Sequence, residues 1–146
     1  MLIPSFPQPT GRGRRAAATV EFALIAPLFI FLIIGAIEVS RGILVKQALS
    51  DAARRACHTG TQPGTSNATI IKDVNDMLTD NKIDSTSATI TILVNDVQVD
   101  ASTAKQDDKL SVKVAVPVSK VMLLTAIFLR QSQIESETVV MMRYGG

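Results

Sequence analysis

An uninterrupted apolar segment, FALIAPLFIFLIIGAI at residues 22–37, is the feature that most limits how this chain can fold. As a helix, its sixteen residues would be about 24 Å long at about 1.5 Å per residue. The hydrocarbon core of a bilayer is about 30 Å thick and needs roughly 20 residues of helix. The segment reaches that length only if residues 16–20 join it. The sequence therefore predicts a transmembrane helix that contains Glu21 at or inside the membrane boundary.

The position of Glu21 requires an explanation, because it is the only charged residue between Arg15 and Glu38. Even on insertion scales, a carboxylate within hydrocarbon costs about 2.5 kcal/mol or more. Two interpretations are open from the residues alone. The side chain can extend back to the lipid headgroups, or it can have a positively charged partner within the membrane.

Basic residues on both sides of the apolar segment bear on its orientation. Arg12, Arg14 and Arg15 precede it with no acidic residue among them, and this cluster favours a cytoplasmic N-terminus. Four basic residues also follow the segment before residue 58, so the charges are nearly balanced. Long downstream domains are translocated largely regardless of charge. We therefore expect the N-terminus in the cytoplasm and the C-terminal portion outside it.

The helical pattern continues beyond the apolar segment, and a second helix follows. We expect a leader without regular structure at residues 1–13, one helix over residues 16–58, a linker of turn-forming residues at 58–67 and a second helix at 66–81. The apolar face expected for the outer part of the long helix comprises Leu44, Val45, Ala48, Leu49, Ala52, Ala53 and Ala56. That of the second helix comprises Ile70, Ile71, Val74, Met77 and Leu78.

The period of the apolar residues then changes from helical to alternating. Alternation predicts strands at residues 88–94 and 110–118, and a last strand at 133–142. Asn95 and Asp96 are expected to form a turn. The apolar stretch at residues 119–129 is too short to span a bilayer, and we expect it to be buried or to lie on the membrane surface. The fold class is therefore α+β, with an antiparallel sheet of about three strands.

Composition excludes several classes of function. The net charge is +4 up to His58 and −2 from Thr59 onward, with one Tyr and no Trp, so nucleic-acid binding is not expected. No spacing typical of a metal or cofactor site occurs, and we expect neither. Cys57 is the only cysteine, and the adjacent His58 would point in a different direction on a helix. We therefore expect a buried thiol, no catalytic residues and no enzymatic activity.

The segment RRAAATVEFALIAPLFIFLIIGAIEVSRG, at residues 14–42, resembles the N-terminal signature of TadE-like proteins. These are minor pseudopilins of the tight-adherence apparatus, which builds Flp pili similar to type IV pili. The positions that match the family pattern are Arg14, Arg15, Val20, Glu21, Phe22, Ala23, Leu24, Pro27 and Glu38. The family usually has glycine before its processing site, where this chain has Ala16.

This resemblance implies a bacterial protein whose basic leader, residues 1–16, is removed by a membrane prepilin peptidase between Ala16 and Ala17. It implies a transmembrane and spine helix at residues 17–58 and an extracytoplasmic αβ domain at residues 59–146. In pilin-like subunits, the glutamate at the Glu21 position is thought to pair with the N-terminal amine of a neighbouring subunit. The resemblance thus assigns Glu21, Phe22 and Pro27 to subunit assembly.

The expected protein is a single-span, pilin-like subunit of the bacterial cytoplasmic membrane that takes part in pilus assembly for adhesion or secretion. Its expected partners are the prepilin peptidase, other pilin-like subunits and the assembly machinery. One alternative is a membrane-anchored envelope or binding protein that is neither processed nor assembled. A second is a secreted protein cleaved near Ala36, although the apolar run exceeds the ~7–15 residues of a typical signal peptide.

Overall fold

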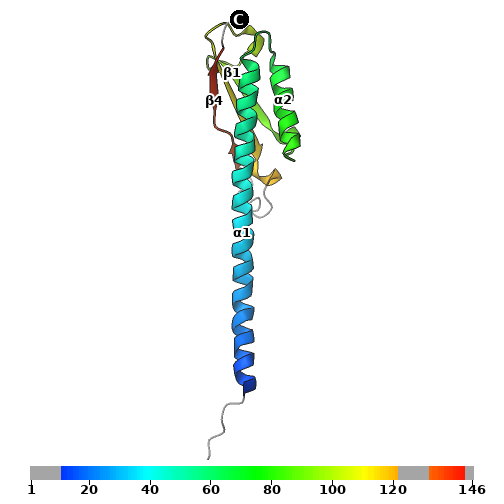
Figure 1. Cartoon of the computed structure of the whole chain (residues 1–146), viewed down its shortest axis with the longest axis vertical. Coiled ribbons are helices and arrows are strands. Elements are labelled where there is room, and N and C mark those ends of the chain that lie inside the picture. The colour runs from blue at the N-terminus through cyan, green and yellow to red at the C-terminus, as the bar shows by residue number, and fades with distance from the viewer. Residues whose placement is uncertain (1–10, 122–131, 144–146) are drawn as a thin grey trace, which may run out of the picture. The chain divides into compact units, whose positions relative to one another are not determined.

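The structure is a computed structural model that describes residues 11–121 and 132–143. The chain divides into two compact units, Met1–Ile37 and Glu38–Gly146. One long helix, α1 (Gly11–Gly60), belongs to both units, and the other elements belong to the second (Figure 1). These elements are α2 (Asn67–Asp80), β1 (Thr89–Val94), β2 (Lys109–Pro117), β3 (Gln133–Glu135), β4 (Val139–Met142) and the 3-10 turns η1 (Ser85–Ser87), η2 (Ala101–Thr103) and η3 (Val118–Lys120). The expected α+β class is confirmed.

The helix α1 begins earlier than the sequence pattern indicated. We expected an unstructured leader at residues 1–13, but Gly11–Gly13 are already helical, while residues 1–10 lie outside the described part of the chain. No proline follows Pro9 until Pro27, so nothing stops the helix from extending toward the N-terminus from the alanine-rich segment. Pro27 lies inside α1 without ending it.

The sheet of the second unit is antiparallel, and β2 is its central strand. β1 pairs with one side of β2, with Ile90 opposite Val114 and Ile92 opposite Val112. On the other side, β4 pairs with the beginning of β2 and β3 pairs with its end. The described residues therefore form four strands, because the single strand expected at 133–142 is divided in two.

Ser136 explains why the last strand is divided. Its hydroxyl oxygen accepts a hydrogen bond from the backbone N–H of Val114 at 3.0 Å. Its own backbone N–H donates to the carbonyl of Val114 at 2.8 Å. The Ser136 side chain thus takes the place of a backbone acceptor, and the regular ladder is interrupted between β3 and β4.

The core of the second unit lies between the inner face of the sheet and the faces of α1 and α2. Cys57 marks how closely α1 approaches the sheet, since its Sγ donates to the carbonyl of Leu110 on β2 at 3.3 Å. Small side chains permit this approach, because Ala52, Ala53 and Ala56 are completely buried beside it. The other completely buried residues of the helices and sheet include Leu49, Ile70, Val74, Leu78, Val112, Val114 and Val116.

The expected apolar faces of the helices are confirmed in their centres and wrong at two positions. Leu44 is 64% exposed and Ile71 is 39% exposed, although both were expected to face the core. Ile71 follows the buried Ile70 and lies at the edge of the apolar face of α2, where the protein no longer covers the helix. Leu44 likewise lies one residue before the buried Val45. Helical periodicity gives the direction of a buried face but not its width.

Two turns show how the loops are built. Asn95 and Asp96 both adopt positive φ, of 50° and 64°, and form the expected turn, after which Val97 makes one bridge back to Val94. Ser66 is the N-cap of α2 by its backbone conformation, but its side chain makes no capping hydrogen bond. Residues 122–129 of the expected buried or surface segment lie outside the described residues.

Candidate membrane and assembly segment

The part of α1 at residues 16–37 exposes large apolar side chains. Phe22 is 73% exposed and Leu24 is 75% exposed, and similar exposure continues through Leu32. Within the described residues, α1 is the one helix long and apolar enough to cross a membrane, and none of its most apolar window is buried by protein. A continuous apolar surface of this kind marks contact with lipid or another protein. The chain is therefore associated with a membrane through a single candidate span.

Glu21 lies on the exposed surface of this segment, between Val20 and Phe22. The sequence contains no basic residue from residue 16 to residue 37 that could pair with Glu21. The nearest basic side chain in the sequence is that of Arg15. A cut between Ala16 and Ala17 would place a new ammonium group four residues before Glu21, which is about one helical turn.

The predicted topology and cleavage residues all lie within α1. The backbone of Arg12, Arg14 and Arg15 is helical, and Ala16 and Ala17 continue the same helix with exposed side chains. The residues before and after the predicted cut thus belong to one unbroken element. Cleavage and the cytoplasmic location of the arginine cluster both stay predictions.

Pro27 changes the hydrogen bonding of the exposed segment. Proline has no backbone N–H, so the carbonyl four residues earlier, that of Ala23, loses its usual partner in the helix. Transmembrane helices tolerate such positions because neighbouring groups can bond the released carbonyl. The Ala23 carbonyl thus adds a polar group to the segment that contains Glu21.

Comparison with known proteins identifies this segment. Residues 16–58 match the sequence model of the family described as TadE-like protein. Residues 16–58 of this chain are therefore similar to TadE-like proteins. The matched residues comprise the apolar segment and the buried, alanine-rich part of α1, whereas residues 59–146 lie outside the match. No match was found among curated proteins or among solved structures.

Cys57, within the TadE-like segment, is buried as expected. Its Sγ lies 3.3 Å from the carbonyl oxygen of Leu110 and 3.7 Å from that of Val139. Burial raises the pKa of the Cys57 thiol to about 11. The thiolate is the reactive form of cysteine, so this environment opposes reactivity.

Arg143 is a structurally important residue that sequence reasoning missed. Its guanidinium is buried and donates hydrogen bonds to the carbonyls of Ala101 at 2.9 Å, Ala104 at 2.7 Å and Gln62 at 3.0 Å. These carbonyls belong to the loop after α1 and to the loop around η2, so Arg143 joins segments that are distant in sequence. A single arginine after VVMM gives no periodic signal that would indicate burial.

Proposed function

We propose that this TadE-like chain is a minor pseudopilin that helps to assemble a Flp-type pilus. In this proposal, the apolar segment of α1 packs against other pilin-like subunits in the cytoplasmic membrane. Residues 59–146 lie on the extracytoplasmic side. The observation that supports it best is the exposed span with one carboxylate, Glu21, inside a segment that matches the family.

The carboxylate of Glu21 provides the physical basis for assembly. Within hydrocarbon, a charged carboxylate without a counter-charge is strongly unfavourable, whereas a pair with an ammonium group is much less so. Processing at Ala16–Ala17 would supply such an ammonium at the start of each mature subunit. A neighbour whose new N-terminus lies beside Glu21 would then fix the register between two packed helices.

The proposal includes no catalytic activity. The thiol of Cys57 is buried and has a raised pKa, which supports a packing role for it. His58 is adjacent in sequence but exposed, so the two side chains face different surroundings. Within residues 11–121 and 132–143, no group of three or more His, Cys, Asp or Glu side chains is arranged to hold a metal ion.

The alternative of an anchored envelope protein that is not processed is favoured by one observation. Because α1 runs without interruption from Gly11 through Ala16 and Ala17, the described part of the leader, residues 11–16, is part of the same helix as the span. A retained leader would keep three arginines at the cytoplasmic end and would leave Glu21 without a nearby N-terminal amine.

The N-terminal residue and intact mass of the protein purified from its own cell membranes distinguish these functions. We expect the mature chain to begin at Ala17. A chain that retains Met1 and the leader would support the unprocessed anchor. A chain that begins after Ile37 would show release from the membrane, and assembly through α1 would then be wrong.

A variant at Glu21 tests assembly separately from processing. We expect Glu21→Gln to be cleaved normally but to lose most of its copurification with other pilin-like subunits, because the amide cannot form the ion pair. Glu21→Asp keeps the charge and should retain part of the association. Equal recovery of partners with the wild type and Glu21→Gln would contradict the assembly role of the carboxylate.

A further inference from the structure

A cavity of about 520 Å³ opens in the second unit next to the first turns that α1 contributes to it. Its volume is within the range of small-molecule sites, roughly 300–1,000 Å³. Residues from α1, from the end of α2 and from η3 form its walls. The lining residues that carry the argument are Arg41, Leu44, Asp51, Lys82, Lys120 and Val121.

The lining of this cavity combines apolar and cationic groups. Leu44 is 64% exposed here, and Val121 is buried beside the opening. Among the described residues, three cations, Arg41, Lys82 and Lys120, line the cavity together with one carboxylate, that of Asp51. Lys120 also has Asp84 nearby, at 4.0 Å between Nζ and Oδ2. Counting both carboxylates, the cations are still in excess, so the cavity favours an anion.

Lys82 occupies a backbone position that usually belongs to glycine. It has a φ of +57° directly after Asn81, the C-cap of α2. Its N–H bonds to the carbonyl of Thr79 at 2.9 Å, and the N–H of Ile83 bonds to that of Leu78 at 2.9 Å. This is the Schellman arrangement, in which glycine avoids a steric cost of the left-handed conformation. A lysine there gives the turn a cation beside the cavity.

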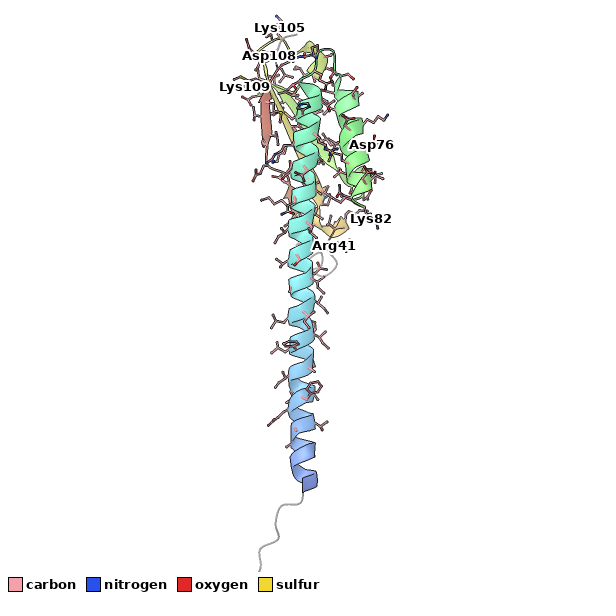
Figure 2. The ribbon with its side chains drawn as sticks, in the orientation of Figure 1. Arg41, Asp76, Lys82, Lys105, Asp108 and Lys109 are labelled. Atoms are coloured by element: carbon pink, nitrogen blue, oxygen red, sulfur yellow. The ribbon has the colours of Figure 1, made fainter. Side chains whose placement is uncertain are left out.

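Charged residues lie at both ends of the second unit. Figure 2 shows Arg41 and Lys82 at one end of this unit, and Lys105, Asp108 and Lys109 at the other. The end with Arg41 is the one at which the unit begins in sequence, because Glu38 is its first residue. The cavity and its cations therefore lie where the chain enters the unit.

The position of Arg41 along the chain brings this residue close to the lipid headgroups. Arg41 follows Ile37, the last residue of the apolar segment, by four positions on the continuous helix α1. Four helical residues rise about 6 Å, and each headgroup layer of a bilayer is roughly 5–7 Å thick. Arg41 thus stays at headgroup depth when residues 16–37 span the bilayer.

We propose that this cavity binds the headgroup of an anionic phospholipid. The phosphate would contact Arg41, Lys82 and Lys120, and the carbon atoms of the headgroup alcohol would lie against Leu44 and Val121. Cations at the membrane surface attract anionic lipids, and an apolar wall beside them suits an amphipathic ligand. The proposal rests on membrane anchoring through α1 but does not depend on pilus assembly.

The test uses the full chain in nanodiscs made of phosphatidylcholine, with or without phosphatidylglycerol. Native mass spectrometry measures how much phosphatidylglycerol stays bound after release from the nanodisc. We expect retention by the wild type and a decrease of about 10- to 30-fold in affinity for the double variant Arg41→Gln/Lys82→Gln. Leu44→Glu, which adds a carboxylate at the cavity wall, should also lower affinity.

The matched control is Lys105→Gln/Lys109→Gln, which removes the same charge at the opposite end of the unit. We expect it to bind like the wild type. Equal losses in the two double variants would show unspecific attraction, and no loss in either would show no site, so both results would overturn the proposal. Equal retention of phosphatidylcholine by the wild type would also overturn the proposal. So would a dimer of the chain that forms without phosphatidylglycerol and is lost in the cavity variants, because a second copy would then occupy the cavity. Protection of the cavity amides from hydrogen exchange by inorganic phosphate alone, as strong as with phosphatidylglycerol, would indicate a free-phosphate site instead.

Discussion

The two parts of α1 are both apolar but differ in the size of their side chains. Residues 22–37 are mainly Phe, Leu and Ile, and most of them are exposed. In residues 45–57, the side chains that face the core are mainly alanine, and Ala52, Ala53 and Ala56 are completely buried. The helix α1 therefore has a surface suited to contact with lipid, followed by a surface suited to packing against protein.

This difference follows from what each part must contact. Lipid chains are fluid and adapt to large side chains, so bulk increases the apolar area without any steric cost. A sheet is rigid, and a helix can approach its backbone closely only through small residues. The 3.3 Å contact between Cys57 Sγ and the Leu110 carbonyl is an example of such an approach. Side-chain size, in addition to hydropathy, thus separates the two surfaces.

Leu49→Ala should have the largest effect on stability. Leu49 is completely buried in the core, whereas Leu44 on the same helix is 64% exposed. Removal of a fully buried leucine leaves a cavity, and we expect a loss of about 2–5 kcal/mol in the free energy of unfolding. Thermal unfolding of the full chain in detergent, followed by circular dichroism, measures it.

Leu44→Ala is the control for this prediction, with an expected change within about 0.5 kcal/mol. Leu28→Ala, in the apolar segment, should likewise leave the unfolding of the second unit unchanged. If Leu49→Ala and Leu28→Ala lowered the unfolding temperature equally, the distinction between the two parts of α1 would be wrong.

An increase in side-chain size should also distinguish the two parts of α1. Ala53→Leu forces extra methylene groups between α1 and the sheet, and we expect a loss of about 1–3 kcal/mol in the free energy of unfolding. Ala23→Leu adds the same groups to the exposed segment and should leave stability unchanged while slightly favouring membrane insertion. Chemical denaturation of both variants in the same detergent provides the comparison. A stable Ala53→Leu protein would show that α1 has space to move away from the sheet.

The sequence was sufficient for the elements whose pattern depends on local periodicity. The span is a continuous apolar run, whereas α2, β1 and β2 each show a regular period over several residues. The structure has a helix or strand at all four places. The assembly residues Glu21, Phe22 and Pro27 were assigned through family resemblance, and the structure adds that all three are exposed. Their role in assembly is still a prediction.

Other features depend on contacts between residues distant in sequence, which periodicity does not report. Ser136 divides the last strand because its hydroxyl meets the N–H of Val114. Arg143 is buried because three backbone carbonyls from two separate loops meet at its guanidinium. The cations Arg41, Lys82 and Lys120 line one cavity only after α1, α2 and η3 come together. None of these juxtapositions follows from the pattern of a single segment.

The smallest effect concerns Cys57 and appears only at alkaline pH. Burial raises the pKa of its thiol from 9.0 to about 11, so the folded protein keeps the proton where the unfolded chain loses it. The stability that this provides is complete below pH 9 and is lost as the pH rises from 9 toward 11. We expect the free energy of unfolding to fall by roughly 1 kcal/mol more for the wild type than for Cys57→Ala over the first pH unit above 9.

Alkylation provides an independent measurement of the same thiol, with a cysteine at the exposed position 44 as reference. In Cys57→Ala/Leu44→Cys, the thiol should react with iodoacetamide at pH 8 at least about 100-fold faster than Cys57 in the wild type, because its thiolate fraction is far larger. Similar rates would mean that the end of α1 opens readily from the sheet. The contrast between a lipid-exposed part and a rigidly packed part of one helix would then no longer hold.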